Sequence, residues 1–350
     1  MRAALTALLV FGLSGAVAAQ TPAAYRLPRE VFDVIPPATR VAGPPGRMRV
    51  VQGRCRPGQL EGARRRIVDI AVQEWAVFGF QTIDATAVRS RALPDGVVPE
   101  AANPPLPRPR QARPVLQGGR TEGERRLAAT IAGYWSATPD GAQVVARQNR
   151  LWRTSDGATL WHQPWSAAFV SWVMCEAGLD QAEVFARDVS HRVYIDQAIR
   201  ARDGLAPAAA YVAHDPGEAP ISPGDLLCNA RGGASYRRLA DRRAELDRYA
   251  PTHCDIVVRV DATRLAVIGG NVMDGVSLTL LPLVTDGTAH PRPVAATDLD
   301  GARTMFAHLA LRAAPIEGTA LEASPTLRAL TGAAVRPTSE TSDLEEGDSP

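Results

Sequence analysis

The order of two hydrophobic periodicities along the chain is the feature that most restricts its fold. Between residues 58 and 201, apolar residues recur at spacings of three, four and seven, as they do on one face of a helix. After residue 224, apolar residues come instead in short runs that are typical of strands. Helices followed by consecutive strands predict an α+β domain with an antiparallel sheet.

The helical spacing predicts four helices in the first part of the chain. In the first of them Ile67, Ile70 and Trp75 share one face, and Gly178 provides a C-cap for the third. The predicted helices cover residues 58–80, 122–135, 167–177 and 184–201. The predicted strands cover residues 225–228, 254–260, 264–268, 276–283 and 305–311, with an arginine-rich helical insert at 236–249.

The segments that lack periodicity predict how the domain is bounded. Residues 20–50 are rich in proline and are expected to be a linker, and 51–93 to be an N-terminal helical part of the domain. Prolines interleaved with arginines at 94–120 predict a surface loop, because proline breaks helices and central strands. The core is expected at 121–315. The tail at 316–350 ends in an acidic stretch that predicts disorder.

The N-terminus has the features of a secretory signal peptide at residues 1–19. Arg2 precedes an uncharged apolar run, and Val17 and Ala19 occupy the small-residue positions of a cleavage site. The alternative is an uncleaved N-terminal anchor. No later apolar stretch is long enough to span a membrane, so no integral membrane segment is expected after cleavage. We therefore expect a periplasmic or secreted protein.

Composition excludes several classes of function. The net charge is only +2, which argues against a nucleic-acid partner. The chain contains no lysine, which rules out Schiff-base and P-loop lysine chemistry. It also has no HExxH motif or paired-histidine spacing, so no metal and no cofactor are expected. Four cysteines in an exported chain favour disulfides, and three pairings are open.

Three short motifs carry residue types that are used in catalysis. Ser166 begins the third predicted helix, where free N–H groups favour a developing negative charge. His253 begins a predicted strand and has the chemistry of a base. Asn271 follows Gly269 and Gly270 at the end of the next strand. The alternatives are a simple N-cap for Ser166, an ordinary hydrogen-bonded histidine for His253, and a hairpin turn for the Gly-Gly-Asn sequence.

The order of these motifs resembles that of the papain-like cell-wall amidases of the CHAP and NlpC-type families. PWSAAFVSW at residues 164–172 is similar to a PWCAAFVNW-like signature, with Ser166 at the position of the catalytic cysteine. GDLL at 224–227, HCDIVV at 253–258 and VIGGN at 267–271 resemble three strands of the same enzymes. The resemblance covers about residues 125–285 and extends to an uncharacterised proteobacterial branch of that clan.

The resemblance implies a fold, a site and a disulfide. The fold is a papain-like core with an N-terminal helical extension, and the activity is hydrolysis of an amide bond in peptidoglycan or a related peptide. Ser166 would be the nucleophile, His253 the general base and acid, and Asn271 the residue that orients the imidazole. Cys228 and Cys254 would form a disulfide across adjacent strands. The remaining Cys55 and Cys175 would pair if the first helix packs on the central one.

The serine in place of cysteine leaves other functions open. A hydroxyl needs a well-placed base, whereas a thiol is partly ionised at neutral pH. The alternatives are an inactive envelope protein that binds murein or a protein partner through the same cleft, and a secreted serine esterase. Further oxyanion or cleft candidates are Gln163 and Trp165 beside Ser166, and His191 and Tyr194, which share a helix face. Gln163 could donate to an oxyanion, as a glutamine does in the papain-type enzymes that the chain resembles. The five tryptophans from Trp135 to Trp172 are expected in the core or in a glycan-stacking wall.

Overall fold

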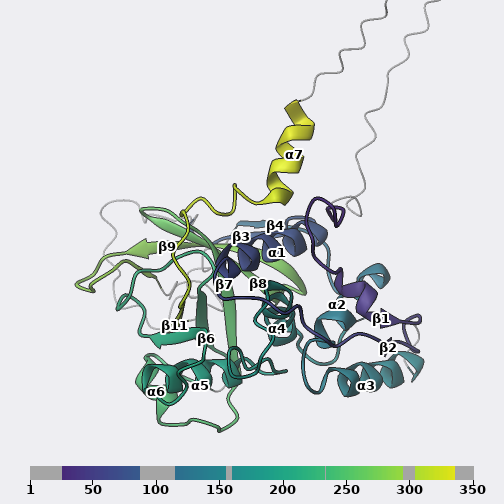
Figure 1. Ribbon diagram of the computed structural model, residues 1–350, viewed down its shortest axis with the longest axis horizontal. Coiled ribbons are helices and arrows are strands. Elements are labelled where there is room, and N and C mark those ends of the chain that lie inside the picture. Colours follow the sequence, from purple (N-terminus) through teal and green to yellow (C-terminus); the bar gives the residue numbers. More distant parts are fainter. Residues whose placement is uncertain (1–25, 87–114, 155–159, 233, 295–303, 336–350) are drawn as a thin grey trace, which may run out of the picture.

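The computed structural model describes residues 26–86, 115–154, 160–232, 234–294 and 304–335. The expected signal peptide, most of the proline-rich loop and the acidic end of the tail lie outside these residues. The described residues form an α+β fold built on a nine-stranded, mostly antiparallel sheet (Figure 1). The strands of this sheet are β3 (Thr82–Asp84), β4 (Val115–Gln117), β5 (Tyr211–His214), β6 (Leu226–Ala230), β7 (Thr252–Val260), β8 (Arg264–Val272), β9 (Gly275–Val284), β10 (Arg292–Pro293) and β11 (Met305–Leu311).

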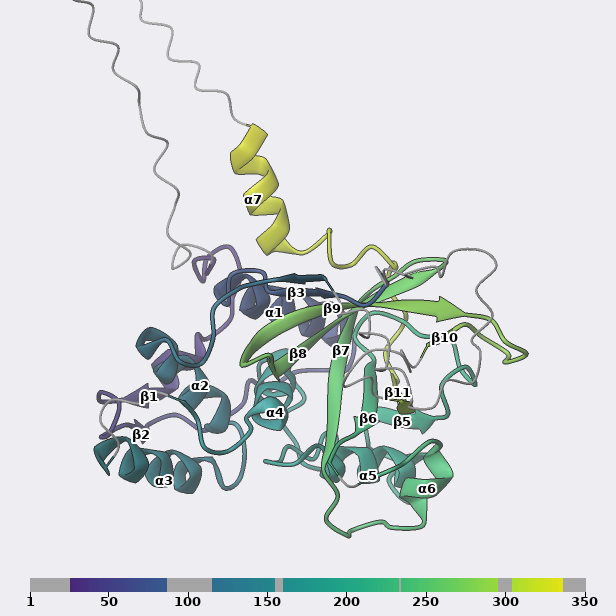
Figure 2. The same cartoon turned by 180° about the vertical axis from the view of Figure 1, so that it is seen from behind.

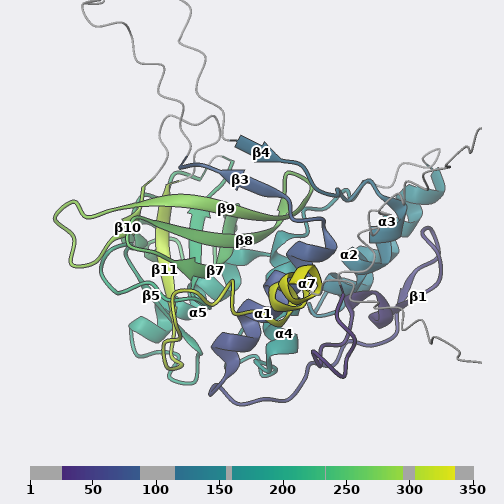
Figure 3. The same ribbon diagram turned by 90° about the horizontal axis from the view of Figure 1, so that it is seen from above.

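The centre of the sheet is the meander that the sequence predicts. Strands β6, β7, β8 and β9 pair antiparallel in chain order, and β11 and β5 follow on the β6 side. On the other side, β3 pairs parallel with β9 and β4 closes the edge (Figure 3). The last residues of the loop expected at 94–120 therefore belong to the sheet. An edge strand needs a hydrogen-bonding partner on one side only, which this short segment finds in β3.

Helices cover mainly one face of the sheet. The helices are α1 (Ala63–Val77), α2 (Ala128–Trp135), α3 (Gly141–Thr154), α4 (Ser166–Ala177), α5 (His191–Arg202), α6 (Leu239–Arg243) and α7 (Pro325–Val335), with 3₁₀ turns η2 (Pro37–Arg40) and η3 (Arg125–Leu127). Both α1 and α4 contact β7 and β8, and α4 lies between the sheet and α2 (Figure 1). Helix α5 contacts β5, β11 and α6, while α7 contacts α1 and projects from the body (Figure 2).

The central strands are buried on both faces. Ile256 and Ile268 face the main core with α4, whereas Val257 and Val267 belong to a smaller apolar cluster on the opposite face. Alternate residues of a strand point to opposite faces, so a run of apolar residues serves both clusters. This double burial explains why these strands are readable in the sequence as continuous apolar runs.

Residues 26–50 are part of the folded domain, so the linker predicted at 20–50 is wrong over this range. Phe32, Val34 and Met48 are buried in the main core. Arg40, which is fully buried, forms an ion pair with the fully buried Glu176 of α4. Because these contacts join residues far apart in the chain, they leave no hydrophobic periodicity in the segment itself. The segment also contains the small strands β1 (Val41–Ala42) and β2 (Arg49–Val50).

Several predicted helices differ from the observed ones at their ends. Helix α5 begins at His191 and not at residue 184, because Ser190 is extended and precedes the first helical residue. Helix α2 begins at Ala128, after the 3₁₀ turn η3. The insert at 236–249 is helical only over Leu239–Arg243. Beyond residue 316, Ala320 and Leu321 are buried and α7 follows, so the tail begins later than predicted.

Two disulfides tie the fold together. Cys228 and Cys254 are directly opposite on β6 and β7 and are bonded, as the resemblance implies. Cys55 and Cys175 form the second bond, which fixes the segment before α1 to α4. Within the ranges that the structure describes, no helix has both the length and the apolar character needed to cross a membrane.

Candidate active site

Ser166 is the first residue of α4 and its side chain contacts an imidazole. The N-cap position belongs to Trp165, so the N-cap alternative for Ser166 does not hold. The Oγ of Ser166 lies 2.7 Å from Nε2 of His191, and Ser166 is 5% exposed. The first N–H groups of α4 precede the earliest intrahelical donor, Phe169, whose N–H bonds to the Trp165 carbonyl. They give the site the local positive potential of a helix N-terminus.

The imidazole that contacts Ser166 belongs to His191, a residue that the sequence suggests only as an oxyanion or cleft candidate. His191 begins α5 and is 3% exposed. Its Nδ1 accepts a hydrogen bond from the backbone N–H of Cys254 at 3.2 Å and also contacts the hydroxyl of Tyr194, one turn later on α5. The direct pairing of Ser166 with His253 is thus replaced by a pairing with His191.

The contacts of His191 define the position of its proton in the neutral ring. A backbone N–H can only donate, so the Nδ1 that receives it from Cys254 must carry a lone pair. The ring hydrogen is then on Nε2, which donates to the Oγ of Ser166. The hydroxyl of Tyr194 can donate or accept, and burial raises the pKa of Tyr194 well above its ordinary value, which keeps it neutral. The described contacts therefore favour a resting pair in which Ser166 accepts.

His253 lies beside His191 and is oriented by a carboxylate. The ring centroids of the two histidines are 5.0 Å apart. Nε2 of His253 lies 2.7 Å from Oδ1 of Asp255, two residues further along β7 and on the same side of the strand. Asp255 has room there because Gly269 faces it on β8: a Cβ on Gly269 would lie 1.9 Å from that oxygen. The partner that orients His253 is thus Asp255, not Asn271.

Asn271 has a different role from the one expected. It lies in β8 at an irregularity in the pairing with β9, and its φ of 54° is left-handed. Its Oδ1 accepts from the backbone N–H of Trp165 at 3.3 Å, and its Nδ2 donates to Glu122 at 3.2 Å. The hairpin turn itself is formed by the next residues, Met273 and Asp274, which also have positive φ. Asn271 therefore anchors the backbone immediately before Ser166.

Glu122 completes that anchor and was not singled out from the sequence. Its carboxylate accepts from Nε1 of Trp165 at 2.5 Å and from the backbone N–H of Trp161 at 3.0 Å, besides the bond from Asn271. Burial is the main influence and raises the pKa of Glu122, while these hydrogen bonds act in the opposite direction. One buried carboxylate thus holds the segment that leads into α4.

The remaining predicted cleft residues take structural positions. Trp165 is fully buried and its ring lies 5.7 Å from that of Tyr134, centroid to centroid. Trp135 and Trp172 are fully buried as well, so these tryptophans are core residues and not a glycan-stacking wall. The Oε1 of Gln163 accepts from Arg147 of α3 at 3.4 Å, which places this side chain on the α3 side of the segment. Across the described ranges, no cluster of three histidine, cysteine or acidic side chains forms a metal site.

One member of the cluster, Asp255, and one contact, that of His191 with Ser166, were not predicted from the sequence. Asp255 had a usable signal, because residues two apart on a strand share a face and His-x-Asp therefore pairs a histidine with a carboxylate. The contact of His191 with Ser166 had none, because it joins the first residues of two helices through tertiary packing. The cluster that the structure brings together is Ser166, His191, Tyr194, His253 and Asp255.

Comparison with known proteins gives a single finding. The sequence profile of a bacterial family described as "uncharacterized protein conserved in bacteria (DUF2272)" matches residues 125–309. This range contains every member of the cluster and every strand from β5 to β9. No curated protein and no solved structure matches the chain.

Proposed function

Because this chain belongs to the DUF2272 family, whose description assigns no activity, we propose a function from the geometry of its own site. The protein is an exported hydrolase that cleaves an amide bond of peptidoglycan or a related peptide, with Ser166 as nucleophile. The observation that carries the proposal is the 2.7 Å contact between Oγ of Ser166 and Nε2 of His191 at a helix N-terminus. The substrate class rests on the resemblance to CHAP and NlpC-type amidases.

In this reaction His191 takes the role of general base and acid that the sequence motifs predict for His253. Attack of Oγ on the substrate carbonyl carbon transfers the hydroxyl hydrogen to Nε2, and the leaving amine later receives it. Nε2 can accept only if the ring hydrogen is on Nδ1, where the hydroxyl of Tyr194 provides an acceptor. Catalysis therefore requires a tautomer change that exchanges the Cys254 N–H contact for a bond to Tyr194.

The rest of the cluster supports the charge changes of such a step. Burial is the main cause of the raised pKa of Tyr194, and the negative charges of Asp188 and Asp255 add to it. The charge of Asp255 also favours the cation that forms on His191. The free N–H groups at the start of α4 are suited to the oxyanion of the tetrahedral intermediate. Two disulfides support an oxidising compartment and hence the proposed periplasmic or secreted location.

A second function is favoured by a specific observation. Ser166 and His191 are 5% and 3% exposed, and the Cys254 N–H holds His191 in the tautomer that donates to Ser166. A serine that is buried and accepts a hydrogen bond is not poised to attack a substrate. This arrangement favours a non-catalytic envelope protein that binds murein or a protein partner. Tyr194 separates the two functions, because only the hydrolase needs its hydroxyl.

Digestion of purified peptidoglycan sacculi, with analysis of the released fragments, tests the proposal. The wild-type chain is expected to release fragments with new amide-derived termini, and Ser166→Ala to release none. Tyr194→Phe is expected to lower the rate by about 10²-fold or more, since it removes the acceptor for the active tautomer. Gln197→Ala, a change elsewhere on α5, is the control for helix perturbation. Inert wild-type protein with intact murein binding would support the second function instead.

A further inference from the structure

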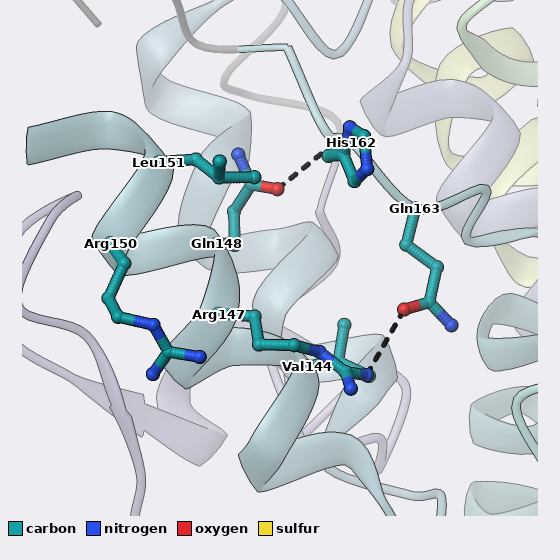
Figure 4. A pocket seen from close by; sticks show the side chains of 7 residues that line it. All are labelled: Val144, Arg147, Gln148, Arg150, Leu151, His162 and Gln163. Atoms are coloured by element: carbon teal, nitrogen blue, oxygen red, sulfur yellow. Dashed lines mark hydrogen bonds between the residues drawn. The ribbon is translucent and has the colours of Figure 1, made fainter. Parts of the chain in front are cut away.

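We propose that a groove beside the candidate site binds the carboxylate-bearing end of a peptide. The groove lies between α3 and the segment that leads into α4 and has a volume of about 280 Å³ (Figure 4). Val144, Arg147 and Leu151 contribute to it from α3, and His162 and Gln163 from the opposite side. That the bound peptide is the end of a substrate rests on the proposed function. Binding of such a peptide to the groove is measurable without turnover.

The walls of the groove are held in place before any ligand binds. Gln148, which is 3% exposed, donates from Nε2 to the carbonyl of Leu160 at 3.0 Å. Its Oε1 accepts from the backbone N–H of His162 at 3.0 Å. One side chain of α3 therefore fixes the segment across from it at two adjacent points, and binding costs little reorganisation.

The charge of the groove selects an anion. Arg147 and Arg150 are three residues apart on α3, so both side chains leave the same face of the helix and both line the groove. Arg147 extends towards Gln163, a neutral acceptor at 3.4 Å (Figure 4). Over the parts of the chain that the structure describes, no carboxylate forms an ion pair with either arginine. The planar donor pair of one guanidinium group matches a carboxylate, and the second arginine adds positive charge to the same groove.

The size and apolar lining of the groove indicate a peptide end. Val144 is buried and Leu151 is 41% exposed, and both line the groove. They give the aliphatic part of a bound peptide an apolar surface to pack on. The volume is just below the range of about 300–1,000 Å³ that is usual for ligand pockets, which suits one or two residues and not a glycan strand. Gln163 precedes Ser166 by three residues, at most about 11 Å of chain. A peptide of two or three residues is therefore long enough to span the distance from the groove to Ser166.

Isothermal titration calorimetry on the full chain carrying Ser166→Ala tests this groove without consuming the ligand. The probes are acetyl-Ala-Ala with a free carboxylate, the same peptide with a C-terminal amide, and inorganic phosphate. The free acid is expected to bind at least tenfold more tightly than the amide. Arg147→Gln and Arg150→Gln are each expected to weaken binding of the acid at least fivefold. Arg237→Gln, an equal loss of charge near α6, is expected to leave it unchanged.

Three results would overturn the assignment. Equal affinity for the acid and the amide would show that the groove does not recognise the carboxylate. Unchanged binding in both arginine variants would place the ligand elsewhere. Phosphate that binds as tightly as the peptide acid would reduce the groove to a general anion site. A wild-type chain that is inert on sacculi while the acid binds as expected would contradict the proposed hydrolase and leave the groove assignment standing.

Discussion

At the residue scale, the position of one proton on His191 decides how Ser166 behaves. The contacts of Nδ1 with the Cys254 N–H place the hydrogen on Nε2 in the resting protein. We expect long-range ¹H–¹⁵N spectra to show neutral His191 as the Nε2–H tautomer. His253 is expected in the same tautomer, because its Nε2 faces the Asp255 carboxylate. An Nδ1–H tautomer for His191 would contradict the resting arrangement, and Ser166→Ala provides the assignment control.

Asp69 on α1 is predicted to make stability depend on pH. Burial raises the pKa of this carboxyl from 3.8 to about 7, against the lowering influence of Arg65, Arg66 and Arg328, with Glu317 acting in the same direction as burial. Between these two pKa values the folded protein holds a proton that the unfolded chain has lost. The contribution of Asp69 to stability is therefore complete below about pH 4 and is lost as pH rises through about 7.

The replacement Asp69→Asn removes this dependence. A pKa difference of that size corresponds to at most roughly 4 kcal/mol, so we expect the variant to be more stable than wild type by about 1–3 kcal/mol at pH 8. The advantage should shrink as the pH falls towards 4. Urea unfolding at pH 4.5, 6 and 8 measures it, with the exposed Glu61→Gln as control. If the variant and the wild type differ in stability by the same amount at all three pH values, Asp69 is not the source of the pH dependence.

At the element scale, the irregularity of β8 at Asn271 is what positions the start of α4. Asn271→Ala loses two hydrogen bonds and keeps a Cβ at a left-handed φ of 54°, which alanine tolerates less well than asparagine does. Asn271→Gly loses the same bonds but tolerates the left-handed backbone. We expect the alanine variant to be less stable than the glycine variant by about 1 kcal/mol, measured by chemical unfolding. Both should lower any activity equally. The reverse order of stability would show that the backbone there is not strained.

The two disulfides are predicted to contribute unequally. The chain-entropy relation gives about 5 kcal/mol for Cys55–Cys175, which are 120 residues apart, and about 3.5 kcal/mol for Cys228–Cys254, which are 26 apart. Removing each pair by double alanine replacement should reproduce this order in the free energy of unfolding. If removing Cys228–Cys254 lowers the free energy of unfolding more than removing Cys55–Cys175, the chain-entropy account is wrong. The Cys228–Cys254 bond would then stabilise the pairing of β6 with β7 in the folded protein.

The elements that the sequence revealed are those whose buried face is apolar. Helix α4 and strands β6 to β9 were predicted for that reason. Helix α3 was not, because Gln148 and Asn149 occupy part of its buried side, where Asn149 bonds to both backbone groups of Met48 at 2.6 and 3.0 Å. Polar residues that are satisfied by distant backbone give no apolar period.

At the scale of the whole molecule, contacts between distant segments assemble the candidate site. Ser166 starts one helix, His191 starts another, and Asp255 comes from a strand. The sequence motifs supplied Ser166 and His253, since each lies at the start of an element. The pairing of Ser166 with His191 depends on how α4 and α5 lie together. The anchoring by Glu122 depends on how the segment before η3 meets β8 and the start of α4. No local pattern in the sequence records either arrangement.

The central claim is that Ser166 is a nucleophile activated within this cluster. The most direct measurement is treatment of the full chain with a fluorophosphonate, followed by mass spectrometry of the digested protein. We expect a single phosphonylated serine, Ser166, and loss of the label in His191→Gln at unchanged thermal stability. A folded wild-type protein that remains unlabelled at Ser166, or one labelled equally in the His191 variant, would contradict the account.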